Sequence, residues 1–258
     1  MEILATITLA TIPAFLLLDF LIQKRKFNKP RYWRLQGLLV TGAIFYFTGE
    51  IGVFWGTVTE GYSLLNLSGL GIAAGTVIGI LVYELVHYWY HRAAHTWNWL
   101  WFAGHQMHHS AESLDAFGAY YLHPFDAAMF TTWGSLVFFP LLGVAPEAGA
   151  IAALFLTFNA MFQHANIKTP HWLGYLIQRP ESHTIHHGRG IHRYNYADLP
   201  LWDMVFGTFR NPRSVEGQEV GFYNGASTRI PAMLIGKDVS KPVAPEREPN
   251  EVFFRHSN

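Results

Sequence analysis

Apolar residues are concentrated in five long runs along the chain. Three of these runs, 3–22, 35–55 and 64–83, contain at most two charged residues each. A helix of about twenty apolar residues has the length needed to cross the hydrocarbon core of a bilayer. The first run also lacks the basic start and the small-residue cleavage site of a signal peptide. These runs predict three retained transmembrane helices rather than buried helices of a soluble protein.

The other two runs, 127–144 and 148–161, flank the turn sequence "GVAPEAG". They are shorter than the first three, and together they predict a helical hairpin that only partly crosses the bilayer. No run has the alternating pattern of a half-buried strand. We therefore expect an all-α fold, a multi-span transmembrane helical bundle.

The segment between the first two runs, "QKRKFNKPRYWR" at 23–34, has six basic residues and no acidic one. Basic loops next to membrane spans usually stay in the cytoplasm, so the first span is expected to end there. Counting onward, the loop "GTVTEGYSLLN" is external, and the third span returns to the cytoplasm near His87. Thirteen of the fourteen histidines fall between His87 and His192. This topology places them at or beyond the inner ends of the spans, which favours one cytoplasmic histidine site in a multi-pass membrane protein.

Composition narrows the chemistry of such a site. The chain has no cysteine, so thiolate ligands, disulfides and a cysteine nucleophile are excluded. Its formal net charge is zero, which gives no indication of a nucleic-acid partner. Any metal must therefore be bound through nitrogen or oxygen.

The histidines occur in three clusters with helical spacing, and one more stands alone at the end of the last apolar run. These clusters are His87, His91 and His95; His105, His108 and His109; and His183, His186 and His187; the single residue is His164. Residues three or four apart share one face of a helix. Neutral imidazole is a common ligand of zinc, copper, iron and nickel. Nine or more candidates are too many for one ion, whereas two octahedral ions offer twelve positions. The count favours a two-metal centre with iron as the expected metal, and it does not separate iron from manganese or zinc.

The sequences "HRAAH" (91–95), "HQMHH" (105–109) and "HTIHH" (183–187) resemble the three histidine boxes of the sterol desaturase and fatty acid hydroxylase superfamily. The stretches "LHPFD" (122–126), "QHAN" (163–166) and "NYADLPLWDMVFGTFRNP" (195–212) resemble further family marks. The resemblance extends over roughly residues 80 to 212.

This resemblance implies a helical membrane base and a cytosolic helical cap that holds two iron ions, which zinc is able to replace in a purified sample. It implies an enzyme that uses dioxygen and two electrons to hydroxylate or desaturate a lipid. No reductase motif is present, so a separate ferredoxin-like or cytochrome-like donor is expected. We expect N-terminal transmembrane helices in 1–60, a catalytic domain in 61–212 and a cytosolic tail in 213–258. The implied metal ligands are His91, His95, His105, His108, His109, His164, His183, His186 and His187.

The chain departs from some family members at Ala160, where they have another ligand four residues before His164. The residues considered as a substitute ligand or as supports of the site are His87, His123, Asn159, His192 and Asp203. Carboxylates that could accept the free N–H of a bound imidazole are Glu84, Asp115, Asp126 and Asp203. His171 is expected at the membrane interface, and no role is expected for His256. The tryptophans at 89, 97, 99 and 101 are expected in an aromatic belt.

Two other functions compete with the oxidative one. A metal-transporting membrane protein should carry histidines along its transmembrane path, whereas here they cluster at one end. A zinc hydrolase should carry a motif such as H-E-x-x-H, which the sequence lacks.

Overall fold

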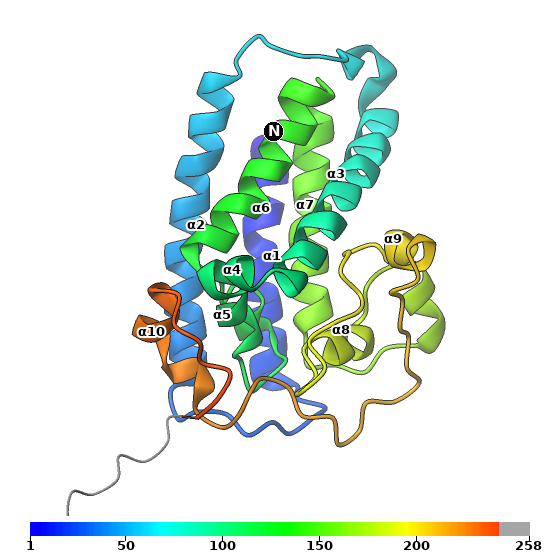
Figure 1. Ribbon diagram of the computed structural model, residues 1–258. Coiled ribbons are helices and arrows are strands. Elements are labelled where there is room, and N and C mark those ends of the chain that lie inside the picture. Colours follow the sequence, from blue (N-terminus) through cyan, green and yellow to red (C-terminus); the bar gives the residue numbers. More distant parts are fainter. Residues whose placement is uncertain (243–258) are drawn as a thin grey trace, which may run out of the picture.

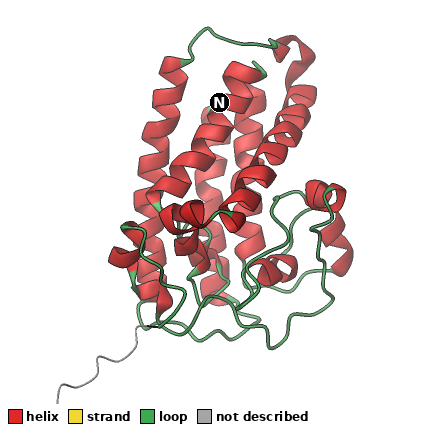
Figure 2. Cartoon of the chain, in the orientation of Figure 1, coloured by secondary structure: helices red, strands yellow, loops and turns green. Residues whose placement is uncertain are grey.

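The computed structural model describes residues 1–242, and within this range every regular element is helical (Figures 1 and 2). The expected all-α class is thus confirmed, with one isolated antiparallel bridge between Gly188 and Val220. His256 and the end of the expected tail 213–258 lie outside the described residues. The long helices are α1 (Glu2–Leu21), α2 (Trp33–Val58), α3 (Gly71–Thr96), α6 (Pro124–Leu136) and α7 (Pro146–His164).

The five long helices form a bundle in which α1 packs on α7, α2 on α6, and α3 on α7 (Figure 1). Three segments are long and apolar enough to cross a membrane: Glu2–Leu21, Trp33–Val58 and Leu67–Thr96. Many of their large apolar side chains face outward, as expected for a surface in contact with lipid rather than water. The chain is accordingly a multi-span membrane protein with the three predicted spans.

The third span differs from its expected limits at both ends. It begins with the short 3₁₀ helix η1 (Leu67–Leu70) and continues as α3 to Thr96, well past the apolar run 64–83. No glycine or proline interrupts the sequence from 80 to 96, so nothing breaks the helix at the membrane edge. One continuous helix therefore carries His87, His91 and His95.

The helical hairpin extends further than expected. It consists of α6, the π-helical turn η4 (Val137–Leu141) and α7. At its tip, the carbonyls of Pro140 and Leu141 accept hydrogen bonds from the backbone N–H groups of Leu64 and Leu65, at 2.8 and 3.1 Å. The hairpin thus runs beside α3 up to the loop that precedes that span. Gly79 permits this close packing, because a Cβ at that position would collide with the Phe138 ring.

Short helices and loops form a cap at the other end of the bundle (Figure 1). The cap packs on the membrane base through a core that includes Trp33, Met107, Tyr121 and Met233. Its elements are α4 (Asn98–Leu100), the π-helical turn η2 (Trp101–His105), α5 (Gln106–His109), η3 (Ala116–Gly118), η5 (His171–Tyr175), α8 (Pro180–His186), α9 (Pro200–Val205), η6 (Ala226–Thr228) and α10 (Ile230–Leu234).

Candidate metal centre

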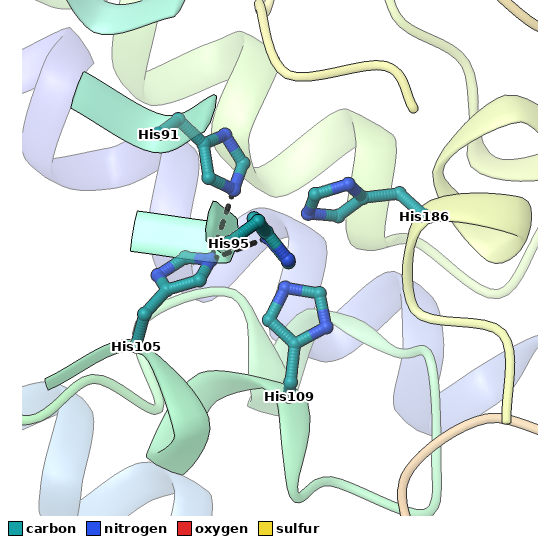
Figure 3. A group of neighbouring side chains, drawn as sticks. All are labelled: His91, His95, His105, His109 and His186. Atoms are coloured by element: carbon teal, nitrogen blue, oxygen red, sulfur yellow. Dashed lines mark hydrogen bonds between the residues drawn. The ribbon is translucent and has the colours of Figure 1, made fainter. Parts of the chain in front are cut away.

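The nine histidines named from the boxes and from His164 are gathered in two neighbouring groups between the base and the cap. The five-histidine group consists of His91, His95, His105, His109 and His186 (Figure 3). The four-histidine group consists of His108, His164, His183 and His187. Within each group, the ligand atoms lie within 4.8 Å of one another.

In the five-histidine group, α3 supplies His91 and His95, one turn apart on the same face. The turn η2 supplies His105, α5 supplies His109 and α8 supplies His186. Nε2 of His105 lies 2.9 Å from Nε2 of His91 and 3.0 Å from Nε2 of His95. Figure 3 shows the five rings turned toward one another from three directions.

In the four-histidine group the Nε2 atoms also lie close to one another. Nε2 of His164, at the end of α7, lies 3.2 Å from Nε2 of His108 and 3.1 Å from Nε2 of His183. Nε2 of His187 lies 3.1 Å from Nε2 of His183. Helices α5, α7 and α8 meet at this point.

The second and third boxes are each divided between the two groups. His108 and His109 are adjacent in sequence but point into different groups, because successive residues on a helix differ by about 100°. The same holds for His186 and His187. The rings of His109 and His187 stack with centroids 4.1 Å apart, so the two groups are in direct contact. The second and third boxes therefore each contribute to both groups, and the two groups together form one centre.

Acceptors on the outer side of several rings define which ring nitrogen carries the proton. Nδ1 of His91 lies 2.7 Å from the carbonyl oxygen of Tyr196, and Nδ1 of His186 lies 2.7 Å from that of Tyr194. A carbonyl oxygen only accepts, so Nδ1 must donate and Nε2 of each ring bears a lone pair. This is the tautomer that a metal ligand requires.

Two further rings are fixed in the same way. Nδ1 of His164 donates to the carbonyl oxygen of Ala160 at 2.8 Å, and Nδ1 of His105 donates to the carboxylate of Asp126 at 2.8 Å. The expectation that Asp126 supports an imidazole is thus matched by the geometry. Glu84, Asp115 and Asp203 bond to other partners instead.

These nitrogens fit a metal ion. His91 and His105 present lone pairs to each other at 2.9 Å, and Nε2 of His109 and of His186 are buried without a hydrogen-bond partner. Buried acceptors left unpaired are costly unless a cation or donor satisfies them. Metal–imidazole bonds of about 2.1 Å give adjacent nitrogens about 3.0 Å apart in an octahedron and about 3.4 Å apart in a tetrahedron. The observed spacings of 2.9 to 3.2 Å are closer to the octahedral arrangement.

The cap histidines are held in their neutral form. Burial, followed by repulsion from neighbouring imidazoles, lowers the pKa of His109 and His187 well below 6.5. The same two causes act on His108 and His183, whose pKa is also well below 6.5. Neutral imidazole is the state that binds metals, so the site is prepared for an ion near neutral pH.

Other candidates from the sequence are placed beside the groups. His192 lies next to His109, with their Nδ1 atoms 3.1 Å apart, and burial lowers the pKa of His192 to about 4. Trp101 packs its ring on His95, His109 and His192, so it covers the centre instead of joining an aromatic belt. Trp101 is the first residue of the π-helical turn η2, and its side chain points toward these histidines.

The remaining predicted supports are engaged elsewhere. Nδ1 of His123 caps α6 by accepting from the Phe125 N–H at 3.0 Å. Asp203 accepts the backbone N–H groups of Tyr196 and Ala197 at 2.9 and 2.8 Å and so fixes their loop. His171 contacts the Asn211 carbonyl at 3.1 Å.

His87 and Asn159 lie outside both groups. The His87 ring stacks on His91 with centroids 5.5 Å apart, but His87 falls in a separate cluster with Glu84 and Asp198. Asn159 donates to the carbonyl oxygen of Asp198 at 2.7 Å. Within residues 1–242 no histidine takes the place of Ala160, which leaves four imidazoles in one group and five in the other.

The backbone carbonyls that orient His91 and His186 were not predicted from the sequence. They come from a turn in which His192, Tyr194 and Asn195 have φ values of 41°, 72° and 52°. Such left-handed conformations are uncommon outside glycine and asparagine. The Asn195 side chain holds the turn by donating to the carbonyls of Ser182 and Arg210, both at 2.9 Å. The "NY" of 195–196 is the only trace of this support in the sequence.

Comparisons of the sequence with known proteins identify its family. Alkylglycerol monooxygenase of Danio rerio is 34% identical over 139 residues, covering 51% of this chain and 30% of the relative. The human alkylglycerol monooxygenase is 37% identical over 132 residues, covering 48% and 28%. Sphinganine C4-monooxygenase 1 of Arabidopsis thaliana is 27% identical over 178 residues, covering 67% and 68%.

The alignment thus covers less than a third of the length of the alkylglycerol monooxygenases. No solved structure matches the chain significantly. The sequence profile described as "Fatty acid hydroxylase" matches residues 76–208, which include all nine histidines of the two groups. With just over half of its length matched, the chain belongs to the fatty acid hydroxylase family.

Proposed function

We propose that the protein is a membrane-bound non-haem di-iron oxidoreductase that hydroxylates or desaturates a lipid with dioxygen and two electrons. The observation that carries this proposal is the division of nine buried imidazoles into two touching groups of five and four. A structural zinc takes four ligands and a catalytic zinc usually three, whereas five imidazoles suit a six-coordinate ion such as iron.

His91, His95, His105, His109 and His186 would hold one ion, and His108, His164, His183 and His187 the other. When bound, a pair of irons supplies the activation of dioxygen and the oxidation of an unactivated C–H bond. In hydroxylation, one oxygen atom enters the substrate and the other leaves as water, with two electrons and two protons consumed. The four-histidine group has one imidazole fewer than the other, so the ion that it would hold would have fewer protein ligands.

The protein's own residues supply the setting for this chemistry. Asp126 and the carbonyls of Tyr194 and Tyr196 keep the imidazoles in one tautomer and one orientation. Trp101 covers the five-histidine group and limits the access of water. The apolar outer surface of α1, α2 and α3 is suited to lipid contact, which favours entry of the substrate from the bilayer.

The relatives support a lipid substrate without identifying it. Their names are alkylglycerol monooxygenase, sphinganine C4-monooxygenase and very-long-chain aldehyde decarbonylase. Electrons would come from a separate ferredoxin-like or cytochrome-like protein. The basic segment 23–34 lies on the same end of the bundle as the cap, which by the positive-inside rule supports a cytoplasmic centre.

The test is lipid mass spectrometry on cells with and without the gene, grown under ¹⁸O₂ and ¹⁶O₂. A hydroxylase yields a lipid that depends on the gene and gains the label, and a desaturase yields a gene-dependent loss of two hydrogens. A His108→Ala chain serves as the inactive control. Unchanged lipids in an expressing cell, with a suitable electron donor co-expressed, would contradict the proposal.

A further inference from the structure

A third cluster of buried ligand-type side chains lies beside the five-histidine group. It consists of Glu84 and His87 on α3 and Asp198 on the loop before α9, with ligand atoms within 4.8 Å of one another. Glu84 is 0% exposed, His87 8% and Asp198 7%. None of the nine histidines belongs to this cluster, and the proposed di-iron centre makes no use of it.

Several polar atoms in this cluster have no partner. Oε1 of Glu84 and Nδ1 of His87 are buried and form no hydrogen bond. Oδ1 of Asn159 is buried and unpaired as well, and its amide nitrogen fixes the loop by donating to the Asp198 carbonyl at 2.7 Å. Unpaired buried polar atoms are rare in folded proteins, and three in one place require an explanation. Nε2 of His109 and of His186, in the proposed iron group, are unpaired in the same way.

The two carboxylates of the cluster also have no cationic partner among residues 1–242. The other oxygen of Glu84 accepts the backbone N–H groups of Asp198 and Leu199 at 2.8 and 3.1 Å, and Asp198 accepts from Gln163 at 2.7 Å. These donors are neutral. Two buried carboxylates are costly without a cation, and more so at the membrane end of α3.

From these observations we propose that Glu84, His87 and Asp198 bind a third metal ion, a divalent first-row cation such as Mn²⁺, Fe²⁺ or Zn²⁺. Two carboxylates and one imidazole form a donor set suited to such ions, and no thiolate is present. The ion neutralises the charge and pairs the free atoms of Glu84 and His87. The unpaired amide oxygen of Asn159, whose amide nitrogen donates to the Asp198 carbonyl, is a candidate for a further ligand.

This ion has a positioning role. It links α3 to the loop before α9, in which the Tyr196 carbonyl, two residues before Asp198, orients His91. Loss of the ion should therefore loosen this loop and weaken the orientation of His91, without removing any of the nine histidine ligands. The proposal does not depend on iron, dioxygen or a lipid substrate.

The experiment locates metal in the full-length protein purified in detergent. The chain is stripped with chelator, reloaded with Mn²⁺ alone and studied by anomalous scattering at the manganese edge. We expect a peak among Glu84, His87 and Asp198 that is separate from any peak in the histidine groups. The absence of that peak at full loading overturns the proposal, and peaks among the nine histidines remain informative about the proposed di-iron centre on their own.

Metal content provides a second readout. His87→Phe keeps an aromatic ring against Phe130 and Tyr83 but removes the ligand nitrogen. It should bind one ion fewer than the wild type and still give an oxidisable histidine centre. His171→Phe, which lies outside all three clusters, is the matched control and should retain full metal content. Equal metal content in wild type and His87→Phe would refute the third site, as would a wild-type chain whose ions are all accounted for by the histidine groups.

Discussion

The carboxylate of Asp126 on α6 accepts hydrogen bonds from two side chains. Oδ2 accepts from Nδ1 of His105 at 2.8 Å, and Oδ1 accepts from the Tyr90 hydroxyl at 2.7 Å. In an Asp126→Ala variant no carboxylate faces Nδ1 of His105, so this ring loses the acceptor that fixes its tautomer. We expect the metal affinity of the five-histidine group to fall about 10- to 100-fold, as measured by chelator competition. Tyr90→Phe removes only the second bond and should bind metal normally. If both variants bind as the wild type does, Asp126 does not orient His105.

Ala160 offers a test of the difference between the two groups. It lies one helical turn before His164 and is partly buried, so a longer side chain at this position can reach the four-histidine group. Ala160→His is expected to add a fifth imidazole there and to raise metal affinity in that group. If an open position is used by dioxygen, the lipid product should decrease at the same time. Ala160→Leu controls for bulk, and an equal affinity in both variants would show that the added imidazole does not reach the metal.

The lowered pKa of the cap histidines predicts a pH dependence of stability. Burial lowers the folded-state pKa of His109, His183 and His187 well below 6.5. Below about pH 6.5, the unfolded chain therefore binds more protons than the folded one, and the free energy of unfolding falls as the pH is lowered. Each such histidine contributes up to about 1.4 kcal/mol per pH unit in that range.

The measurement is the unfolding temperature of the metal-free protein in detergent from about pH 8 to pH 5. We expect a plateau above pH 6.5 and a decrease below it. Replacing His183 by Gln should make the decrease less steep. A constant unfolding temperature across this range would mean that these imidazoles are not held neutral by burial.

The absence of cysteine makes the orientation in the membrane directly measurable. Single substitutions Lys26→Cys and Tyr62→Cys put one thiol in each of the two loops that flank α2, and both positions are exposed. In intact cells, a membrane-impermeant thiol reagent should label Tyr62→Cys and not Lys26→Cys; after lysis it should label both. Labelling of Lys26→Cys in intact cells would put the histidine groups on the opposite side from the one proposed.

Hydropathy and spacing predicted the parts of the fold that follow from local rules. The three spans and the helical placement of His91 and His95 could be read from runs of apolar residues and from i, i+4 spacing. The hairpin was underestimated, because its tip is stabilised by backbone hydrogen bonds to the loop near Leu64, which hydropathy cannot reveal.

The partition of the boxes could not be predicted in the same way. Spacing put His105, His108 and His109 on one helical face, yet the π-helical turn before α5 and the packing of α8 assign His108 to a different group from the other two. The roles of the Tyr194 and Tyr196 carbonyls could not be predicted either. Every residue type has a backbone carbonyl, and the direction of these two depends on the left-handed turn that contains them. Sequence thus identified the ligand candidates, and tertiary structure determined their grouping.

The central claim is that the two histidine groups each bind one iron. Anomalous scattering at the iron edge, on anaerobically purified and iron-loaded protein, tests it most directly. We expect one iron peak in the five-histidine group and one in the four-histidine group. His186→Ala should weaken or remove the first peak, and His108→Ala the second. A single peak shared by all nine histidines, or iron in only one group at full loading, would contradict it.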